Sequence, residues 1–295
     1  MQRSFTLQGH RGARGLFPEN TIEGFAATMA LGVHGLELDV AITADGVPVV
    51  SHDPDLDPDL TRTADGRWLE GERLLIRHLT LAEIKSFDVG RIRPGSALAL
   101  AHPQQRPRDG ARIPTLAEVF ALTAGSTVRV DAELKLRPER PEASVSGAAM
   151  ADAVLACARA AGALDRLDLR SFDWLALRYA GAAAPWIRRT YLSRRFRPEL
   201  ASFYFDRALD GTISATLAGE AAGREICWAP EWMTLTEALL ADSQARGIPV
   251  MPWTVNDPAE MQRFIGWGVD GFCTDRPDLA RAAMAQAGLT LPTPQ

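Results

Sequence analysis

Residues 35–53, Gly-Leu-Glu-Leu-Asp-Val-Ala-Ile-Thr-Ala-Asp-Gly-Val-Pro-Val-Val-Ser-His-Asp, decide how this chain folds. The first part alternates apolar residues with Glu37 and Asp39, which predicts a strand ending in two carboxylates. The Asp45-Gly46 pair then predicts a hairpin turn. If these two residues form the turn, His52 lies directly opposite Asp39, and the Cβ atoms of such cross-strand partners are roughly 4.5–5.5 Å apart. The stretch therefore predicts one place where carboxylates and a histidine meet.

Outward from this stretch, apolar runs alternate with amphipathic helical stretches, the pattern of a parallel sheet. Eight runs predict strands, at residues 5–9, 35–40, 127–133, 166–171, 187–192, 225–229, 249–254 and 271–274. The stretches between them predict helices, at residues 21–31, 115–123, 146–161, 173–180, 234–246, 258–265 and 277–287. This order within 295 residues predicts the α/β class and a (β/α)8 TIM barrel.

Residues 53–112 interrupt the alternation and are rich in Pro, Asp, Arg and Gly. They contain one helical stretch, at 80–87, and are much longer than an ordinary barrel loop. We expect an insertion that follows the hairpin and caps the active-site mouth, within a single domain of residues 1–295. The acidic run from Asp53 to Asp59 lacks the Gly and Glu of a calcium-binding loop and predicts an acidic rim.

The composition is that of a soluble globular protein, with 46% hydrophobic residues and a mean hydropathy of −0.08. A net charge of −5 argues against nonspecific binding of nucleic acid. No apolar run approaches the ~18 residues of a membrane-spanning helix. The three cysteines are expected to be buried and unpaired, and the protein cytoplasmic. The alternative is a periplasmic or secreted protein whose signal peptide has been removed. The oligomeric state stays open.

Glu37 and Asp39 point the same way because side chains alternate along a strand. Two such carboxylates repel each other unless a positive group lies between them. A hard divalent cation, Mg²⁺ or Ca²⁺, is one answer, and exposed rim acids bridged by arginines are the other. The pattern recurs at Glu133 and Lys135 at the end of the third strand. Glu133 is a candidate third ligand.

Lysine is rare in this chain, since Lys85 and Lys135 are the only two among 32 basic residues. Lys85 falls in a solvated helix, but Lys135 stands at a strand end and is a candidate to bind an anionic substrate. Arg11 follows the first strand and offers a planar fork that suits phosphate.

Histidine is also scarce, and two of the five histidines end predicted strands of this region, His10 and His52. Hydrolysis of a phosphodiester needs its charge offset, a base for the nucleophile and an acid for the leaving oxygen. Two histidines, an arginine, a lysine and a metal supply that set. The remaining histidines are expected to be structural or solvated: His34, His78 and His102.

Four further positions have less specific signals. Glu19 could order Arg11, whereas Asn20 and Thr21 are expected to cap the helix that follows. Trp253 ends the seventh predicted strand, where it lines a substrate pocket or packs in the core.

Taken together, the motifs resemble those of glycerophosphodiester phosphodiesterases, in family order along nearly the whole chain. They are Gly-His10-Arg11-Gly with Pro18-Glu19-Asn20-Thr21, Glu37-x-Asp39, His52-Asp53, Glu133-x-Lys135, Ser171-Phe172, Trp253-Thr-Val-Asn256 and Gly268-Val-Asp270-Gly271-x-x-Thr274-Asp275-Arg276-Pro277. The resemblance implies a barrel related to phosphatidylinositol-specific phospholipases C. It also implies hydrolysis of glycerophosphodiesters to sn-glycerol 3-phosphate and an alcohol.

Carried over position by position, the resemblance implies an acid–base pair, His10 and His52, and phosphate contacts from Arg11 and Lys135. It implies one divalent metal, Mg²⁺ or Ca²⁺, on Glu37, Asp39 and Glu133. Phe172 and Trp253 become candidates for the substrate pocket. Arg170 departs from the family, which often has a neutral residue there, and either alters alcohol specificity or forms a salt bridge.

Two other functions compete with this one. A lysophospholipase D would act on lipids with an acyl chain, which the apolar residues of the insertion would permit. An inactive barrel used for binding would have lost one or more polar positions, and none is missing here. Whether water or the substrate's own glycerol hydroxyl attacks, the latter through a cyclic phosphate, is not written in the sequence.

Overall fold

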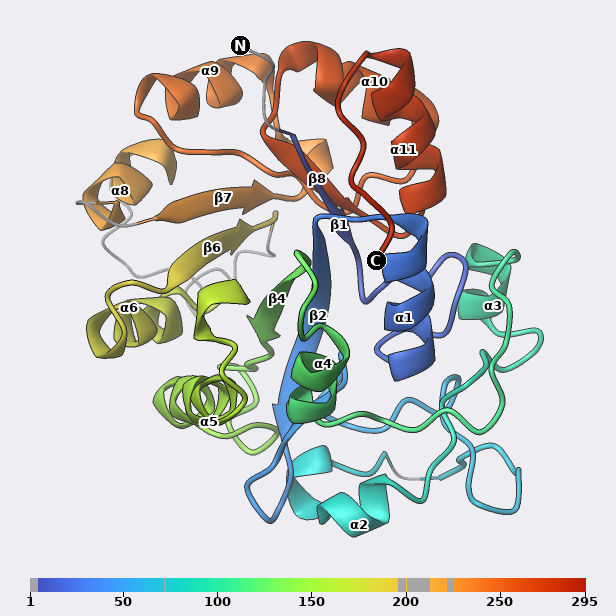
Figure 1. The fold of residues 1–295 in the computed structure, drawn as a ribbon. Coiled ribbons are helices and arrows are strands. Elements are labelled where there is room, and N and C mark those ends of the chain that lie inside the picture. The colour runs from blue at the N-terminus through green and yellow to red at the C-terminus, as the bar shows by residue number, and fades with distance from the viewer. Residues whose placement is uncertain (1–4, 72, 196–199, 201–212, 222–224) are drawn as a thin grey trace.

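The computed structural model describes residues 5–71, 73–195, 200, 213–221 and 225–295. A curled parallel sheet forms its centre, in the order β7-β6-β5-β4-β2-β1-β8 (Figure 1). The strands are β1 (Thr6–Gly9), β2 (Gly35–Ile42), β4 (Arg129–Leu134), β5 (Leu167–Ser171), β6 (Arg188–Ser193), β7 (Ile226–Pro230) and β8 (Gly271–Thr274). A short strand, β3 (Pro48–Val50), pairs antiparallel with β2. The predicted α/β barrel is thus confirmed.

Residues 249–254 close the barrel between β7 and β8, but not as the regular strand that we predicted. On one side Trp228 donates its N–H to the carbonyl of Pro249 at 2.9 Å, and on the other Cys273 donates to the carbonyl of Pro252 at 3.1 Å. The segment forms only isolated bridges. The prediction of a strand was wrong because two prolines lack the N–H groups that a continuous ladder requires.

Helices surround the sheet, and each of the seven predicted helices is present. They are α1 (Ile22–Leu31), α4 (Leu116–Leu122), α5 (Gly147–Ala160), α6 (Trp174–Ala183), α9 (Glu237–Ala245), α10 (Pro258–Trp267) and α11 (Pro277–Gln286). An additional helix, α8 (Ile213–Glu220), was not predicted. Most begin where a Ser, Thr or Asp side chain accepts a backbone N–H of the first turn, as Thr21 does before α1. No described helix is long and apolar enough to span a membrane.

The hairpin after β2 differs from the predicted one by one residue. Ser51 rather than His52 comes opposite Asp39, and the Ser51 N–H donates to the Asp39 carbonyl at 2.9 Å. The turn is longer than two residues because the Thr43 side chain accepts the N–H of Val47 at 2.9 Å. This local hydrogen bond, which an Asp-Gly pair does not reveal, sets the register.

Residues 53–112 follow the hairpin and contain η1 (Ile76–His78), α2 (Leu81–Ile84) and α3 (Ala97–Ala101). In Figure 1, α2 lies beyond the arrowhead of β2, and α3 lies to the right of α1. A small apolar cluster, separate from the main core, joins them to the hairpin: Ala41, Val49, Leu56, Ile76, Ile84 and Ile113. The hairpin therefore serves as the base on which this segment packs.

Candidate active site

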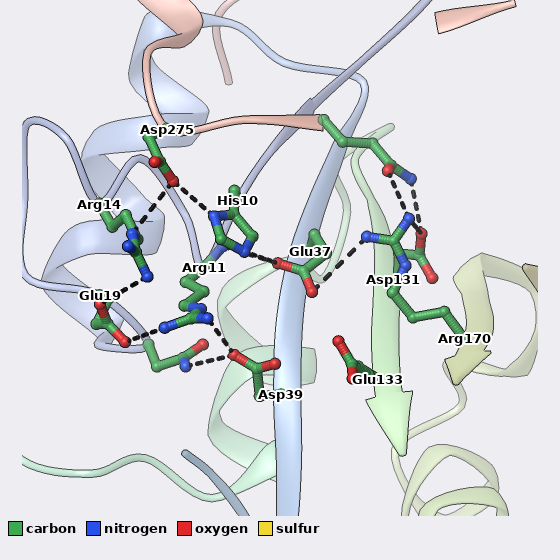
Figure 2. Close-up of polar contacts among 12 residues, drawn as sticks. His10, Arg11, Arg14, Glu19, Glu37, Asp39, Asp131, Glu133, Arg170 and Asp275 are labelled. Atoms are coloured by element: carbon green, nitrogen blue, oxygen red, sulfur yellow. Dashed lines mark hydrogen bonds and ion pairs between the residues drawn. The ribbon is translucent and has the colours of Figure 1, made fainter. Parts of the chain in front are cut away.

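Two neighbouring strands bring three carboxylates together inside the barrel. The register of β2 and β4 places Asp39 beside Glu133, and Glu37 lies two residues before Asp39 on the same face. All three side chains are buried, and one carboxylate oxygen of each lies within 4.8 Å of the other two (Figure 2). Their burial rules out the alternative of exposed rim acids.

The charges of these carboxylates are only partly balanced. Burial and the charge of Asp39 raise the pKa of Glu37 well above its ordinary value. Burial also acts to raise the pKa of Asp39, but Lys135 and Arg11 outweigh it and hold that pKa far below its usual range. Oδ1 of Asp39 accepts no hydrogen bond, and Lys135 Nζ lies 3.4 Å from it. Three buried carboxylates with a free acceptor oxygen fit a hard divalent cation.

The two side chains predicted to bind phosphate, Lys135 and Arg11, contact the carboxylates directly. Lys135 Nζ donates to Glu133 Oε1 at 2.9 Å. Arg11 Nε lies 3.2 Å from Asp39 Oδ2, and Arg11 Nη1 donates to Glu19 Oε1 at 2.8 Å. The expectation that Glu19 orders Arg11 is confirmed.

The loop that carries Arg11 has an unusual backbone. Arg11 and Asn20 have φ angles of 50° and 53°, and in the described part of the chain no other non-glycine residue has a positive φ. The Asn20 N–H donates to the Arg11 carbonyl at 3.0 Å, and its Nδ2 donates to Asp39 Oδ2 at 2.9 Å. Asn20 is thus no helix cap, which is the role of Thr21. Left-handed backbone at side chains of this size concentrates at functional sites.

Arg170 forms salt bridges, one of the two roles considered for it. Its guanidinium lies 3.2 Å from Asp131 Oδ2 and 3.7 Å from Glu37 Oε1. Gln8 completes the group, because its Nε2 donates to the same Asp131 oxygen at 2.8 Å. We did not single out Gln8 or Asp131 as site residues. The available signal was the alternation, which places Asp131 on the same face as Glu133.

His10 is held by an aspartate from the other end of the chain. Its Nδ1 lies 2.5 Å from Asp275 Oδ1, and its Nε2 lies 3.9 Å from Glu37 Oε2 (Figure 2). Because an ionised carboxylate only accepts hydrogen bonds, Nδ1 is the donor and Nε2 faces the carboxylates. Asn256 Nδ2 and Arg14 Nε contact Asp275 at 2.7 and 3.3 Å. Burial lowers the pKa of His10.

His52 has a similar arrangement with its neighbour in sequence. Its Nδ1 lies 2.9 Å from Asp53 Oδ1. Burial, together with the charges of Lys135 and Arg11, lowers the pKa of His52 to about 4, and the charge of Asp39 acts in the opposite direction. His52 therefore lies within electrostatic reach of the same charged groups despite the shifted register, because β3 ends at Val50 and the chain turns.

A cavity of about 100 Å³ lies beside these residues. Arg11 and His52 line one side of it, and residues of the insertion line most of the remainder. Phe172 and Trp253 contact each other edge to face, with ring centroids 5.4 Å apart, and neither lines this cavity. Their role in a substrate pocket stays a prediction.

Comparison with known proteins matches the chain to one family. The sequence model of the glycerophosphoryl diester phosphodiesterase family matches residues 10–279. A glycerophosphodiester phosphodiesterase of Caldanaerobacter subterraneus subsp. tengcongensis is 31% identical over 269 residues, which are 91% of this chain and 93% of that protein. A lysophospholipase D of Mus musculus is 26% identical over 287 residues, 93% of this chain and 80% of that protein.

A solved structure gives the same result for the fold. The crystal structure of a family protein from Silicibacter pomeroyi DSS-3 superimposes with a TM-score of 0.89 at 36% identity, covering 98% of this chain and 95% of that one. The resemblance predicted from the motifs is confirmed. With a family match over nearly the whole chain and a relative above 30% identity, the chain belongs to the glycerophosphoryl diester phosphodiesterase family.

Proposed function

We propose that this phosphodiesterase cleaves glycerophosphodiesters to sn-glycerol 3-phosphate and an alcohol by metal-dependent acid–base catalysis. The observation that carries the proposal is the pair of histidines, each with Nδ1 on an aspartate, next to three buried carboxylates. The acid–base pair would be His10 and His52. The metal ligands would be Glu37, Asp39 and Glu133.

The hydrogen bonds of the two histidines suit proton transfer. With Nδ1–H donated to Asp275 or Asp53, Nε2 is the atom of each ring that exchanges a proton with the substrate. One histidine would take the proton of the attacking hydroxyl, and the other would protonate the leaving alkoxide. The attacking oxygen is that of water or of the substrate's glycerol, and both are deprotonated in the same way.

The cationic side chains suit the charge of the phosphate. A bound Mg²⁺ or Ca²⁺ would polarise the phosphoryl oxygens and offset their charge. Arg11 lines the cavity and is held by Glu19, so its guanidinium is oriented before substrate arrives. Lys135 lies between Asp39 and Glu133 and adds positive charge close to them. We propose that both side chains hold the phosphate.

The insertion, residues 53–112, is part of the proposed site. Because the insertion lines most of the cavity beside His52, we propose that residues 53–112 cap the mouth as part of a single domain. The substrate would be a small molecule. The free cysteines are compatible with the cytoplasmic location predicted from the sequence.

Lysophospholipase D activity is the second candidate, because two relatives are named for that activity and the cavity has apolar walls. The family match and the glycerophosphodiester phosphodiesterase that is similar over 91% of this chain favour the first function.

An assay of glycerol 3-phosphate release is expected to separate these functions. The substrates are glycerophosphocholine, glycerophosphoethanolamine, glycerophosphoinositol and lysophosphatidylcholine. We expect release from at least one glycerophosphodiester. The kcat/KM for lysophosphatidylcholine, followed by choline release, is expected to be at least about tenfold lower. Comparable or higher kcat/KM for lysophosphatidylcholine would establish the lipid activity instead.

Asp275→Asn is expected to lower kcat by at least about tenfold with little change in KM. Asn256 already donates to one oxygen of Asp275, so an amide at this position would turn its NH₂ toward His10 and shift the imidazole proton to Nε2. Steady-state kinetics checks this result. The matched control is Asp278→Asn, since Asp278 pairs with Arg276 rather than with a histidine. Equal kcat in the two variants would contradict a positioning role for Asp275.

A further inference from the structure

The insertion contacts the loop between β1 and α1 at a point far from its own ends. Gln105 Nε2 donates to the carbonyl of Arg14 at 2.7 Å, and the Arg106 N–H donates to the carbonyl of Leu16 at 2.8 Å. Burial lowers the pKa of His102, which follows α3, and the charge of Arg14 lowers it further. The stretch after α3 therefore packs on the loop that carries the first catalytic motif.

The side chain of Arg14 joins two parts of the site. Its Nε lies 3.3 Å from Asp275 Oδ1, and its Nη1 lies 3.6 Å from Glu19 Oε2 (Figure 2). Asp275 holds Nδ1 of His10. Glu19 accepts a hydrogen bond from the guanidinium of Arg11. One planar fork thus contacts both the acid next to His10 and the acid next to Arg11.

Arg14 itself has no place at the substrate. It does not line the cavity beside His52, and its side chain is only 18% exposed. A guanidinium shared by two carboxylates has few positions in which it contacts both, so its backbone must be held as well. The Arg14 carbonyl is held by Gln105, at the hydrogen bond that the insertion provides.

We propose that Arg14 is a positioning residue, which aligns His10 and Arg11 through their two acids, and that Gln105 of the insertion keeps Arg14 in place. The inference rests on the proposed phosphodiesterase function and adds two residues that act on it without touching the substrate. Small displacements of catalytic groups lower rates strongly, so one hydrogen bond at this distance is enough to affect turnover.

The insertion then connects the surroundings of both histidines. It begins at Asp53, whose carboxylate lies 2.9 Å from His52 Nδ1. It returns at Gln105 to the loop that carries His10. A single segment is therefore tied to each member of the proposed acid–base pair, which gives it a role beyond covering the mouth.

The test is a double-mutant cycle of Arg14→Ala and Gln105→Ala, assayed on a glycerophosphodiester that the wild-type enzyme cleaves. Arg14→Ala should lower kcat by at least about tenfold and raise KM at least about threefold, because the His10 and Arg11 sides are both released. Gln105→Ala should lower kcat/KM about fivefold, as expected for one neutral hydrogen bond. In the Arg14→Ala background the same change should cost less than about twofold.

Thermal unfolding separates positioning from folding. Each of the two acids keeps another partner, at 2.8 or 2.7 Å, so Arg14→Ala should remain folded. The loss of the Gln105 hydrogen bond should lower the unfolding midpoint equally in both backgrounds. Its effect on kcat/KM should instead depend on Arg14, which a purely structural hydrogen bond would not show.

The matched control is Gln104→Ala, because Gln104 is the exposed neighbour of Gln105. It should leave kcat and KM unchanged. The inference is overturned if Arg14→Ala keeps both constants within about twofold of wild type. It is also overturned if the effect of Gln105→Ala on kcat/KM is the same with and without Arg14, or no larger than that of Gln104→Ala. A wild-type enzyme that cleaves no glycerophosphodiester would instead refute the proposed function itself.

Discussion

The variants His10→Ala and His52→Ala are each expected to lose about 100- to 10,000-fold in kcat for glycerophosphodiester hydrolysis. Each change removes the nitrogen that exchanges a proton with the substrate. Steady-state kinetics, at substrate concentrations above KM, measures the loss. A near-wild-type kcat in either variant would disprove the acid–base assignment.

The folded state should tolerate the loss of His10. Asp275 retains Asn256 at 2.7 Å and Arg14 at 3.3 Å, so its buried charge stays partnered. A thermal unfolding midpoint close to that of the wild type, with unchanged metal affinity, would separate lost chemistry from lost folding. The control is His78→Ala, because His78 lies in η1 and does not line the cavity beside His52.

Chelation of divalent metal is expected to lower activity by about 100-fold or more, and added Mg²⁺ or Ca²⁺ should restore it. The metal would balance the repulsion among Glu37, Asp39 and Glu133, whose oxygens lie within 4.8 Å of one another. Without it, that repulsion and the charge of the phosphate are not offset. Elemental analysis should find about one equivalent of metal in the active protein. Full activity in excess EDTA, in protein without bound metal, would refute the metal site.

Metal removal should also be visible without an activity assay. Binding to the folded state alone stabilises it, so the chelated protein should unfold at a lower temperature than the loaded protein. Asp39→Asn should remove this difference, because it replaces the carboxylate that carries the free acceptor oxygen. The matched control is Asp45→Asn, an exposed acid in the turn that follows the same strand. It should retain the difference between the two states.

Local patterns were enough to predict most of the architecture. Period-two alternation and helix caps depend on residues a few positions apart, and they located the regular barrel strands and seven of the helices. They also located Glu37, Asp39 and Glu133, because carboxyl ends of neighbouring parallel strands meet at one edge. The prediction of a strand at 249–254 was wrong, because two residues of this apolar run are prolines and lack the N–H groups of a continuous ladder.

Long-range pairs could not be predicted in the same way. His10 and Asp275 are 265 residues apart, and only closure of the barrel between β1 and β8 places them side by side. The hairpin register was missed for a local reason, a side-chain hydrogen bond of Thr43 that lengthens the turn. In both cases the sequence shows the residue types but not their partners.

Periodicity and motifs at strand ends were enough to predict the α/β barrel, its family and the residue types of the site. Which charges are paired became known only from the folded arrangement. Asp53, Asp55 and Asp57 are equivalent in the sequence, yet Arg73 forms ion pairs with the first two and none with Asp57. The physical reason is that a buried charge depends on every neighbour within a few ångströms, and most of those neighbours are distant in the chain.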